Sequence, residues 1–281
     1  MSDAAERHRQ QIAAWNGPLG AQWATDEARM ERALRPVTEA LLAAAGARLG
    51  ETVLDIGCGC GGSSFAFADA VGATGRVIGA DVSAPMLDVA RAGAGAVANT
   101  DFVLADAAAH DFPVASVDLL TSRFGVMFFG DPDAAFGRMR PAMKPDGRVA
   151  LAVWRSVAEN PWVHVPLAAA LTVLPDFPRP GPEDPGPFTF GDPARVTRIL
   201  TAGGFTTPAF AKFDFSMRFP GEPCTAAAAI AALGQVSRAL RNQPDNLRAA
   251  ALDAIATAVD PYSSDGYVSL GAAIWLVTAT T

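Results

Sequence analysis

The feature that most constrains this chain is the run VLDIGCGCGG at residues 53–62. An apolar, strand-like stretch leads into a turn with four glycines, and a helical stretch follows directly. A glycine-rich turn between a strand and a helix lets a ligand come very close to the backbone. The run therefore predicts an α/β domain that binds a nucleotide-like ligand at this turn.

Strands and helices continue to alternate over the next hundred residues. The β-rich runs lie at 52–56, 76–80, 101–104, 117–122 and 148–154, and helical runs at 62–71, 84–92 and 131–143 separate them. This spacing predicts βαβ units with right-handed crossovers and a parallel sheet. The first strands are nearly all apolar, as a sheet covered on both faces requires.

The flanks of this core predict additions to it. Helical stretches at 3–15 and 25–45 precede the first strand, with Thr25 as the expected N-cap of the second stretch and Pro36 expected to kink or divide it. We expect an N-terminal helical cap over residues 1–46. The main domain would cover residues 47–281, with inserted substrate-cap segments at 155–190 and 222–262.

The later part of the chain contains fewer strands. A helix at 162–174 is followed by a Pro/Gly-rich tract at 175–187, which is either a stiff surface connection or the edge of a lid. Asp192 is the expected N-cap of the next helix. The other expected elements are a helix at 193–202, a strand at 209–219, helical runs at 225–240 and 245–259, and a last strand at 267–279.

Composition excludes several classes of protein. Half of the 281 residues are hydrophobic and the formal net charge is −7, which argues against disorder and against a nucleic-acid partner. Three cysteines, two of them separated by one glycine, exclude a disulfide scaffold. The chain shows no signal segment, membrane span or metal-ligand cluster. We expect a soluble, cytoplasmic monomer or homodimer that holds no metal.

Acidic residues follow three successive predicted strands. Asp55 precedes the glycine turn, Asp81 ends the second strand, and Asp106 follows the third. Because parallel strands end at one edge of a sheet, these carboxylates can share one cleft. The turn fits a dinucleotide pattern (GxGxxG), but also a pattern with a preceding acid (DxGxGxG). Asp55 favours the second, since a carboxylate suits an ammonium or sulfonium cation better than a pyrophosphate.

Five segments together resemble a known family. They are VLDIGCGCGGSS, GADVSAPML, FVLADAAA, VDLLTSRFGVMFF and MKPDGRVALAVW, and they resemble class I S-adenosylmethionine-dependent methyltransferases. Within that family they are similar to the small-molecule branch related to ubiquinone/menaquinone-biosynthesis methyltransferases. The resemblance covers residues 10–215. It implies a Rossmann-like, seven-stranded, mostly parallel sheet of order 3-2-1-4-5-7-6 whose last strand is antiparallel, the place of 267–279.

The resemblance also implies a set of cofactor contacts. The methionine part would contact the glycine turn and the end of the fourth strand. The ribose would contact one of the acidic residues. The adenine would contact the loops after the second and third strands. Two N-terminal tryptophans resemble a cap over the cofactor, although core packing is the other interpretation. In chain order, the residues are Trp15, Trp23, Asp55, Gly57, Cys58, Gly59, Asp81, Val82, Met86, Asp106, Ala107, Ser122 and Arg123.

Apolar side chains dominate the expected acceptor side. We predict a substrate pocket formed by Phe124, Met127, Phe128 and Trp162, which would suit an apolar or aromatic small molecule. His164 is the candidate general base if the acceptor must lose a proton, and otherwise a partly exposed helix residue. The sequence does not identify the acceptor atom.

Two other functions compete with methyl transfer. The first is an NAD(P)-dependent oxidoreductase, but neither tyrosine, Tyr262 or Tyr267, has a lysine four residues later, as short-chain dehydrogenases require. The second is a non-catalytic protein that only binds the cofactor, because a binding motif does not prove turnover. The complete cofactor pattern favours a methyltransferase that uses S-adenosylmethionine.

Overall fold

The computed structural model describes residues 3–95, 97–174 and 185–281, so most of the predicted 175–187 tract lies outside the described residues. The chain forms two compact units. The first comprises Met1–Trp154, Pro182–Phe213 and Ile274–Thr281, and the second comprises Arg155–Gly181 and Asp214–Ala273. None of the described helices is both long and apolar enough to cross a membrane.

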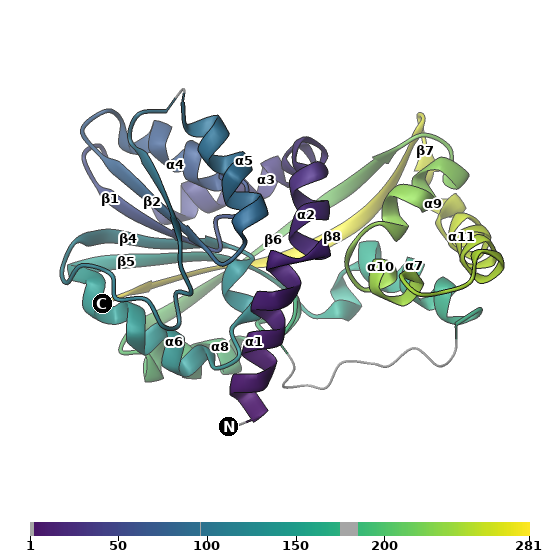
Figure 1. Ribbon diagram of the computed structural model, residues 1–281. Coiled ribbons are helices and arrows are strands. Elements are labelled where there is room, and N and C mark those ends of the chain that lie inside the picture. Colours follow the sequence, from purple (N-terminus) through teal and green to yellow (C-terminus); the bar gives the residue numbers. More distant parts are fainter. Residues whose placement is uncertain (1–2, 96, 175–184) are drawn as a thin grey trace. The chain divides into compact units, whose positions relative to one another are not determined.

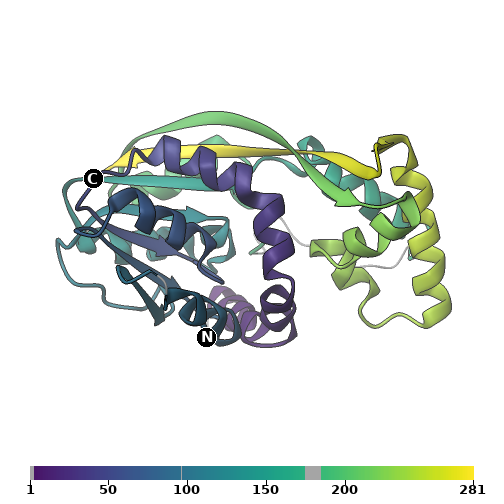
Figure 2. The same ribbon diagram turned by 90° about the horizontal axis from the view of Figure 1, so that it is seen from above.

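The sheet has the order β3-β2-β1-β4-β5-β8-β6, and the very short β7 pairs with β8 (Figures 1 and 2). β1 to β5 are parallel, whereas β8 runs antiparallel to β5 from Arg148 opposite Thr280 to Trp154 opposite Ile274. With β8 counted as the seventh main strand, the predicted order and its antiparallel last strand are confirmed. The strands are β1 (Thr52–Ile56), β2 (Arg76–Asp81), β3 (Thr100–Leu104), β4 (Val117–Arg123), β5 (Met143–Trp154), β6 (Thr206–Pro220), β7 (Ser263–Ser264) and β8 (Tyr267–Thr280).

Helices cover both faces of the sheet in the first unit. α3, α4 and α5 lie on one face and α6 and α8 on the other, while α1 and α2 lie at the edge where the parallel strands end (Figure 1). The elements are α1 (Asp3–Asn16), α2 (Pro18–Thr25), α3 (Glu27–Ala45), α4 (Gly62–Val71), α5 (Ala84–Ala94), η1 (Gly125–Phe128), α6 (Pro132–Met139), η2 (Arg140–Ala142) and α8 (Pro193–Ala202).

The core of this unit lies between the sheet and its helices. Leu54 of β1 and Leu120 of β4 are neighbours in register and fully buried. Phe67 of α4 and Phe136 of α6 are also fully buried. Burying one such side chain contributes about 1.5–3 kcal/mol, so the apolar strands explain why both faces are covered.

The second unit is mainly helical. Its α11 packs against α7 and α9. Its elements are η3 (Val157–Glu159), α7 (Pro161–Leu171), α9 (Pro223–Ala231), α10 (Gly234–Leu240), α11 (Asp245–Val259) and η4 (Asp260–Tyr262), besides β7 and parts of β6 and β8.

Several boundaries near the N-terminus differ from expectation. Residues after Asn16 form the extra helix α2, because Pro18 at its first position has a backbone angle already suited to a helix. Thr25 ends α2, and its hydroxyl donates to the Ala21 carbonyl, so it is not the N-cap of α3. Pro36 does not divide α3, whose buried residues before and after it, Leu34 and Val37, hold the helix onto the core.

Farther along the chain, one expected helix is divided and another begins as predicted. The run 225–240 forms two helices, α9 and α10, with Ala232 and Leu233 between them. The Asp192 carboxylate accepts the Ala194 N–H at 2.9 Å, as an N-cap should.

Candidate cofactor site

The glycine turn after β1 adopts a backbone that favours glycine. Gly57, Gly59 and Gly61 have φ angles of +67°, +57° and +89°. The turn also packs directly against η1, because a Cβ added to Gly57 would lie 2.6 Å from the Cα of Gly125. Two loops separated by more than sixty residues therefore meet backbone to backbone.

Asp55 is a fully buried carboxyl group at the start of this turn. Its Oδ2 accepts the hydroxyls of Ser63 and Ser64 at 2.8 and 2.7 Å. Its Oδ1 has no hydrogen-bond partner within the described part of the chain. Burial raises the pKa of Asp55 to about 6 although the two serines oppose this shift. An unpartnered buried acceptor fits a site completed by a cationic ligand.

Asp81, at the end of β2, is linked to the glycine turn. Its Oδ2 accepts the Gly59 N–H and its Oδ1 the Ser83 N–H, both at 2.8 Å. Burial raises the pKa of Asp81, and these backbone donors oppose the shift. The Val82 N–H is a third backbone donor to this carboxylate. A carboxylate can accept about four hydrogen bonds, so it retains capacity for a ligand hydroxyl such as that of a ribose.

Asp106, after β3, meets a residue that the sequence did not identify. The Nε2 of His8 on α1 lies 2.7 Å from its Oδ2, and the Ala108 N–H donates to its Oδ1 at 3.0 Å. Burial tends to raise the pKa of Asp106, but these hydrogen bonds hold it below the usual value. The partners are 98 residues apart, so no local pattern in the sequence reveals the contact.

The C-terminal end of α1 is fixed to the loop after β2. The amide of Asn16 donates to the Val82 carbonyl at 2.5 Å, and its oxygen accepts the Ala84 N–H at 3.0 Å. The Ser83 hydroxyl donates to the Trp15 carbonyl at 2.7 Å. Helix α1 thus contacts the loops that follow both β2 and β3.

Arg123, at the end of β4, is held by α3. Its guanidinium forms a two-pronged ion pair with Glu31 and donates to the Thr38 hydroxyl at 2.8 Å. The Glu31 carboxylate lies against Gly62, where an added Cβ would be 2.1 Å from Oε2. Glu31 was not predicted; it brings a carboxylate and a guanidinium together beside the glycine turn.

The remaining predicted cofactor residues lie at the same edge of the sheet. Ser122 donates to the Ile56 carbonyl at 2.7 Å, and the terminal methyl of Met86 lies beside Gly59. Ala107 is buried next to Asp106. Burial raises the pKa of the buried Cys58 thiol, so it stays protonated. The rings of Trp15 and Trp23 lie 6.2 Å apart.

Three predicted pocket residues lie in or next to η1: Phe124 directly precedes it, and Met127 and Phe128 belong to it. Phe124 has a φ of +72°, which is unusual for a residue with a side chain, and its ring stacks on Trp154 at 4.3 Å. Phe128 meets the ring of Trp15 edge to face at 5.2 Å. Met127 is buried, and its sulfur accepts the backbone N–H of Trp154, so Met127 packs in the core.

Trp162 and His164 belong to α7 in the second unit. The Trp162 indole donates to the Asn160 side-chain oxygen at 3.1 Å. The roles of both residues toward an acceptor stay predictions.

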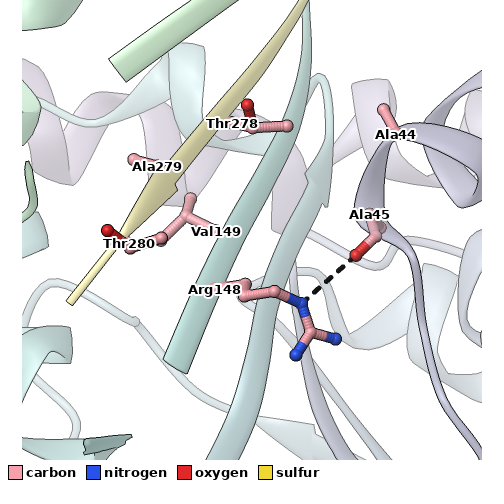
Figure 3. Close-up of a pocket in the computed structure, with 7 residues that line it drawn as sticks. All are labelled: Ala44, Ala45, Arg148, Val149, Thr278, Ala279 and Thr280. Atoms are coloured by element: carbon pink, nitrogen blue, oxygen red, sulfur yellow. Dashed lines mark hydrogen bonds between the residues drawn. The ribbon is translucent and has the colours of Figure 1, made fainter. Parts of the chain in front are cut away.

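One small cavity, of about 140 Å³, lies at the other end of β5 (Figure 3). There the guanidinium of Arg148 donates to the carbonyls of Ala45 and Gly46 at the end of α3 and pairs with Glu51. Arg148 therefore serves as a structural connection between β5 and the end of α3. Within residues 3–95, 97–174 and 185–281, no three His, Cys, Asp or Glu side chains group as metal ligands would.

Comparisons with known proteins agree with this geometry. The profile of the family described as "Methyltransferase domain" matches residues 53–147. Nocamycin O-methyltransferase of Saccharothrix syringae is 31% identical over 196 residues, which cover 66% of this chain and 70% of that protein. The ubiquinone/menaquinone biosynthesis C-methyltransferase UbiE of Pseudoalteromonas translucida is 40% identical over 111 residues, covering 38% of this chain and 44% of UbiE.

A solved structure shares the fold. Phosphoethanolamine N-methyltransferase 2 of Haemonchus contortus, in complex with S-adenosylhomocysteine, matches with a TM-score of 0.53 and 19% identity. The match covers 88% of this chain and 52% of the other. This likeness confirms the fold, and the 31% identical relative shows the predicted family. The chain belongs to the class I S-adenosylmethionine-dependent methyltransferases.

Proposed function

We propose that this methyltransferase acts on an apolar or aromatic small molecule by in-line displacement. The observation that carries the proposal is Phe124, a half-buried ring in a strained backbone conformation, stacked on Trp154. The next residue, Gly125, packs on Gly57. Strained residues of this kind often serve function, and a flat aromatic ring beside the cofactor turn suits a planar, apolar acceptor. Both curated relatives are also named for small organic molecules.

In this proposal, the residues of the site bind the cofactor and orient the two reactants. S-adenosylmethionine, when bound, supplies a methyl group that its sulfonium already activates. Asp81 would accept the ribose hydroxyls, and Asp55 would place negative charge near the cationic end. Aligning the two reactants can lower the barrier by about 7–11 kcal/mol, so positioning is the main task of the protein. A base is needed only for an acceptor that must lose a proton, and His164 is the candidate.

The cofactor part is tested by calorimetric titration with S-adenosylhomocysteine, NAD and NADP. We expect binding of S-adenosylhomocysteine alone. Asp81→Ala should weaken it at least about tenfold, because hydrogen bonds to a charged group are lost. Asp88→Ala removes the same charge from an exposed position on α5 and should bind normally. Binding of a nicotinamide cofactor would instead support the oxidoreductase alternative.

The acceptor part is tested by methyl transfer to a panel of aromatic and polar small molecules, followed by mass spectrometry. Phe124→Leu should raise KM for the preferred acceptor several-fold while the affinity for S-adenosylhomocysteine is unchanged. Phe210→Leu is the matched control, since Phe210 contacts Trp275 in another aromatic pair. Methylation of polar acceptors only would contradict the proposal. Cofactor binding without any product would favour a non-catalytic protein.

A further inference from the structure

The imidazole of His8 is held from two sides. Its Nε2 lies 2.7 Å from Asp106 Oδ2, and the Gly130 N–H donates to its Nδ1 at 3.4 Å. Since Nδ1 accepts a hydrogen bond, the neutral ring carries its proton on Nε2 and donates it to Asp106. One helix and the loops after β3 and η1 therefore combine to orient a single carboxylate.

The Asp106 carboxylate is placed beside the ribose-binding candidate. The Ala105 N–H donates to the Asp81 carbonyl at 2.9 Å, so the two acids end neighbouring strands. Both oxygens of Asp106 already accept one hydrogen bond, from His8 and Ala108, and each has capacity for another. The group is a fixed acceptor with about a quarter of its side chain exposed.

The chemistry of an adenosyl group limits what such an acceptor can recognise. The base, once attached to the ribose, has a single donor group, the exocyclic amino group. A carboxylate that only accepts hydrogen bonds can therefore read adenine only at that amino group.

We propose that His8 is a positioning residue for adenine recognition: it orients Asp106 so that the carboxylate accepts from the exocyclic amino group. The inference rests on the proposed cofactor site and goes beyond it, because it gives α1 a part in selecting the base. His8 acts through Asp106 and does not itself contact the ligand.

A residue at the other end of the same helix provides the matched control. Asn16 fixes α1 to Val82 and Ala84, and its side chain also donates to the Ile12 carbonyl within α1, so its hydrogen bonds do not involve Asp106. Loss of Asn16 loosens the helix, whereas loss of His8 also frees the carboxylate. The two variants therefore separate anchoring of α1 from orientation of Asp106.

The test compares the affinities for S-adenosylhomocysteine and S-inosylhomocysteine, which carries a carbonyl in place of the amino group. The natural protein should prefer the adenosyl ligand by about tenfold or more, because the inosyl carbonyl would face a carboxylate. His8→Ala should reduce this ratio at least about fivefold, and His8→Gln, which retains an N–H donor, should restore part of it. Asn16→Ala should weaken both ligands alike and leave the ratio unchanged.

The outcomes distinguish the two proposals. An unchanged ratio in His8→Ala, or equal binding of both ligands by the natural protein, would overturn the role of His8 and leave the cofactor assignment intact. A natural protein that binds neither ligand would overturn both. Thermal melting of each variant shows whether a lost affinity reflects a lost fold.

Discussion

At the scale of single residues, Asp55 is a proposed cofactor contact whose buried charge is also expected to destabilise the fold. The carboxyl is fully buried beside the glycine turn, and only one of its oxygens has partners among the described residues. A charge in such surroundings destabilises the fold unless a ligand compensates it. Function and stability are therefore expected to oppose each other at this position.

The pH dependence of this penalty follows from the pKa of about 6. The folded protein binds the proton more tightly than the unfolded chain, whose carboxyl has an ordinary pKa of about 3.9. Between these values the folded state holds more protons, so the contribution of Asp55 to stability falls as pH rises. The penalty is fully present above the folded pKa and disappears toward pH 4.

Asp55→Asn should raise the free energy of unfolding of the ligand-free protein at pH 7.5 by about 1–3 kcal/mol, because the buried charge is gone. The gain should shrink as the pH is lowered from 7 to 4, while S-adenosylhomocysteine binds more weakly. Urea unfolding at several pH values measures it. Asp69→Asn, on the exposed side of α4, is the control. A gain that does not depend on pH would show that charge is not its source.

Residues differ in how far the sequence reveals their roles. The common location of Asp81 and Asp106 was predictable, because Asp81 ends β2, Asp106 follows β3, and parallel strands end at one edge of a sheet. His8 and Glu31 were not, since their partners lie 98 and 92 residues away and depend on how α1 and α3 pack. Local pattern therefore predicts which groups border the site, and tertiary packing decides what orients them.

At the scale of elements, the site depends on two loops that touch. The turn after β1 and the η1 turn after β4 approach so closely that a Cβ on Gly125 would lie 2.6 Å from the Cα of Gly57 and 2.7 Å from the Ile56 carbonyl oxygen. Neither neighbouring atom belongs to a flexible side chain, so the backbone itself would have to move.

Gly125→Ala should therefore displace the glycine turn and weaken S-adenosylhomocysteine binding at least about tenfold, with a loss of about 1–3 kcal/mol in stability. Calorimetry and thermal unfolding measure the two effects. Gly137→Ala, in α6, has no atom within 4 Å of its added Cβ and should be neutral or slightly stabilising. Normal binding by Gly125→Ala would mean that contact between the loops is not needed.

The helices and strands also differ in how far the local sequence predicts them. The seven longer strands were predicted, and most of their ends within a few residues, because apolar runs between turns leave few alternatives. The short β7 was not predicted, and β5 begins at Met143, before the predicted residue 148. Helix α2 was missed, since Asn16-Gly17-Pro18 has the composition of a turn although Pro18 also suits a first helical position. The break between α9 and α10 falls just before Gly234, whose φ is +51°, and a single glycine in an otherwise alanine-rich run was passed over as a stop signal.

At the scale of the whole molecule, the chain passes repeatedly between two compact units. The boundary falls after Trp154, within β6 and within β8. The carboxylates and the glycine turn of the cofactor site all belong to the first unit. The second unit has its own buried polar centre in Asn160, whose exposed fraction is 0%.

Asn160 joins the start of α7 to β8. Its oxygen accepts the Ala273 N–H at 2.9 Å, and its amide donates to the Ala273 carbonyl at 3.1 Å. Asn160→Ala leaves the Ala273 N–H without its partner, at a cost of about 1–3 kcal/mol for a buried group. The Ala273 carbonyl keeps the Arg155 N–H, which donates to it at 3.1 Å. All the residues in these contacts belong to the second unit.

We therefore expect Asn160→Ala to increase hydrogen exchange in α7 and α11, while the affinity for S-adenosylhomocysteine stays within about twofold of the natural value. Asn246→Ala, at an exposed position on α11, should change neither quantity. Exchange that also rises throughout β1, β2 and β4, together with weaker binding, would show that the units unfold as one. Because local opening and ligand affinity are measured on the same variant, the experiment separates a structural role of the second unit from a role in cofactor binding.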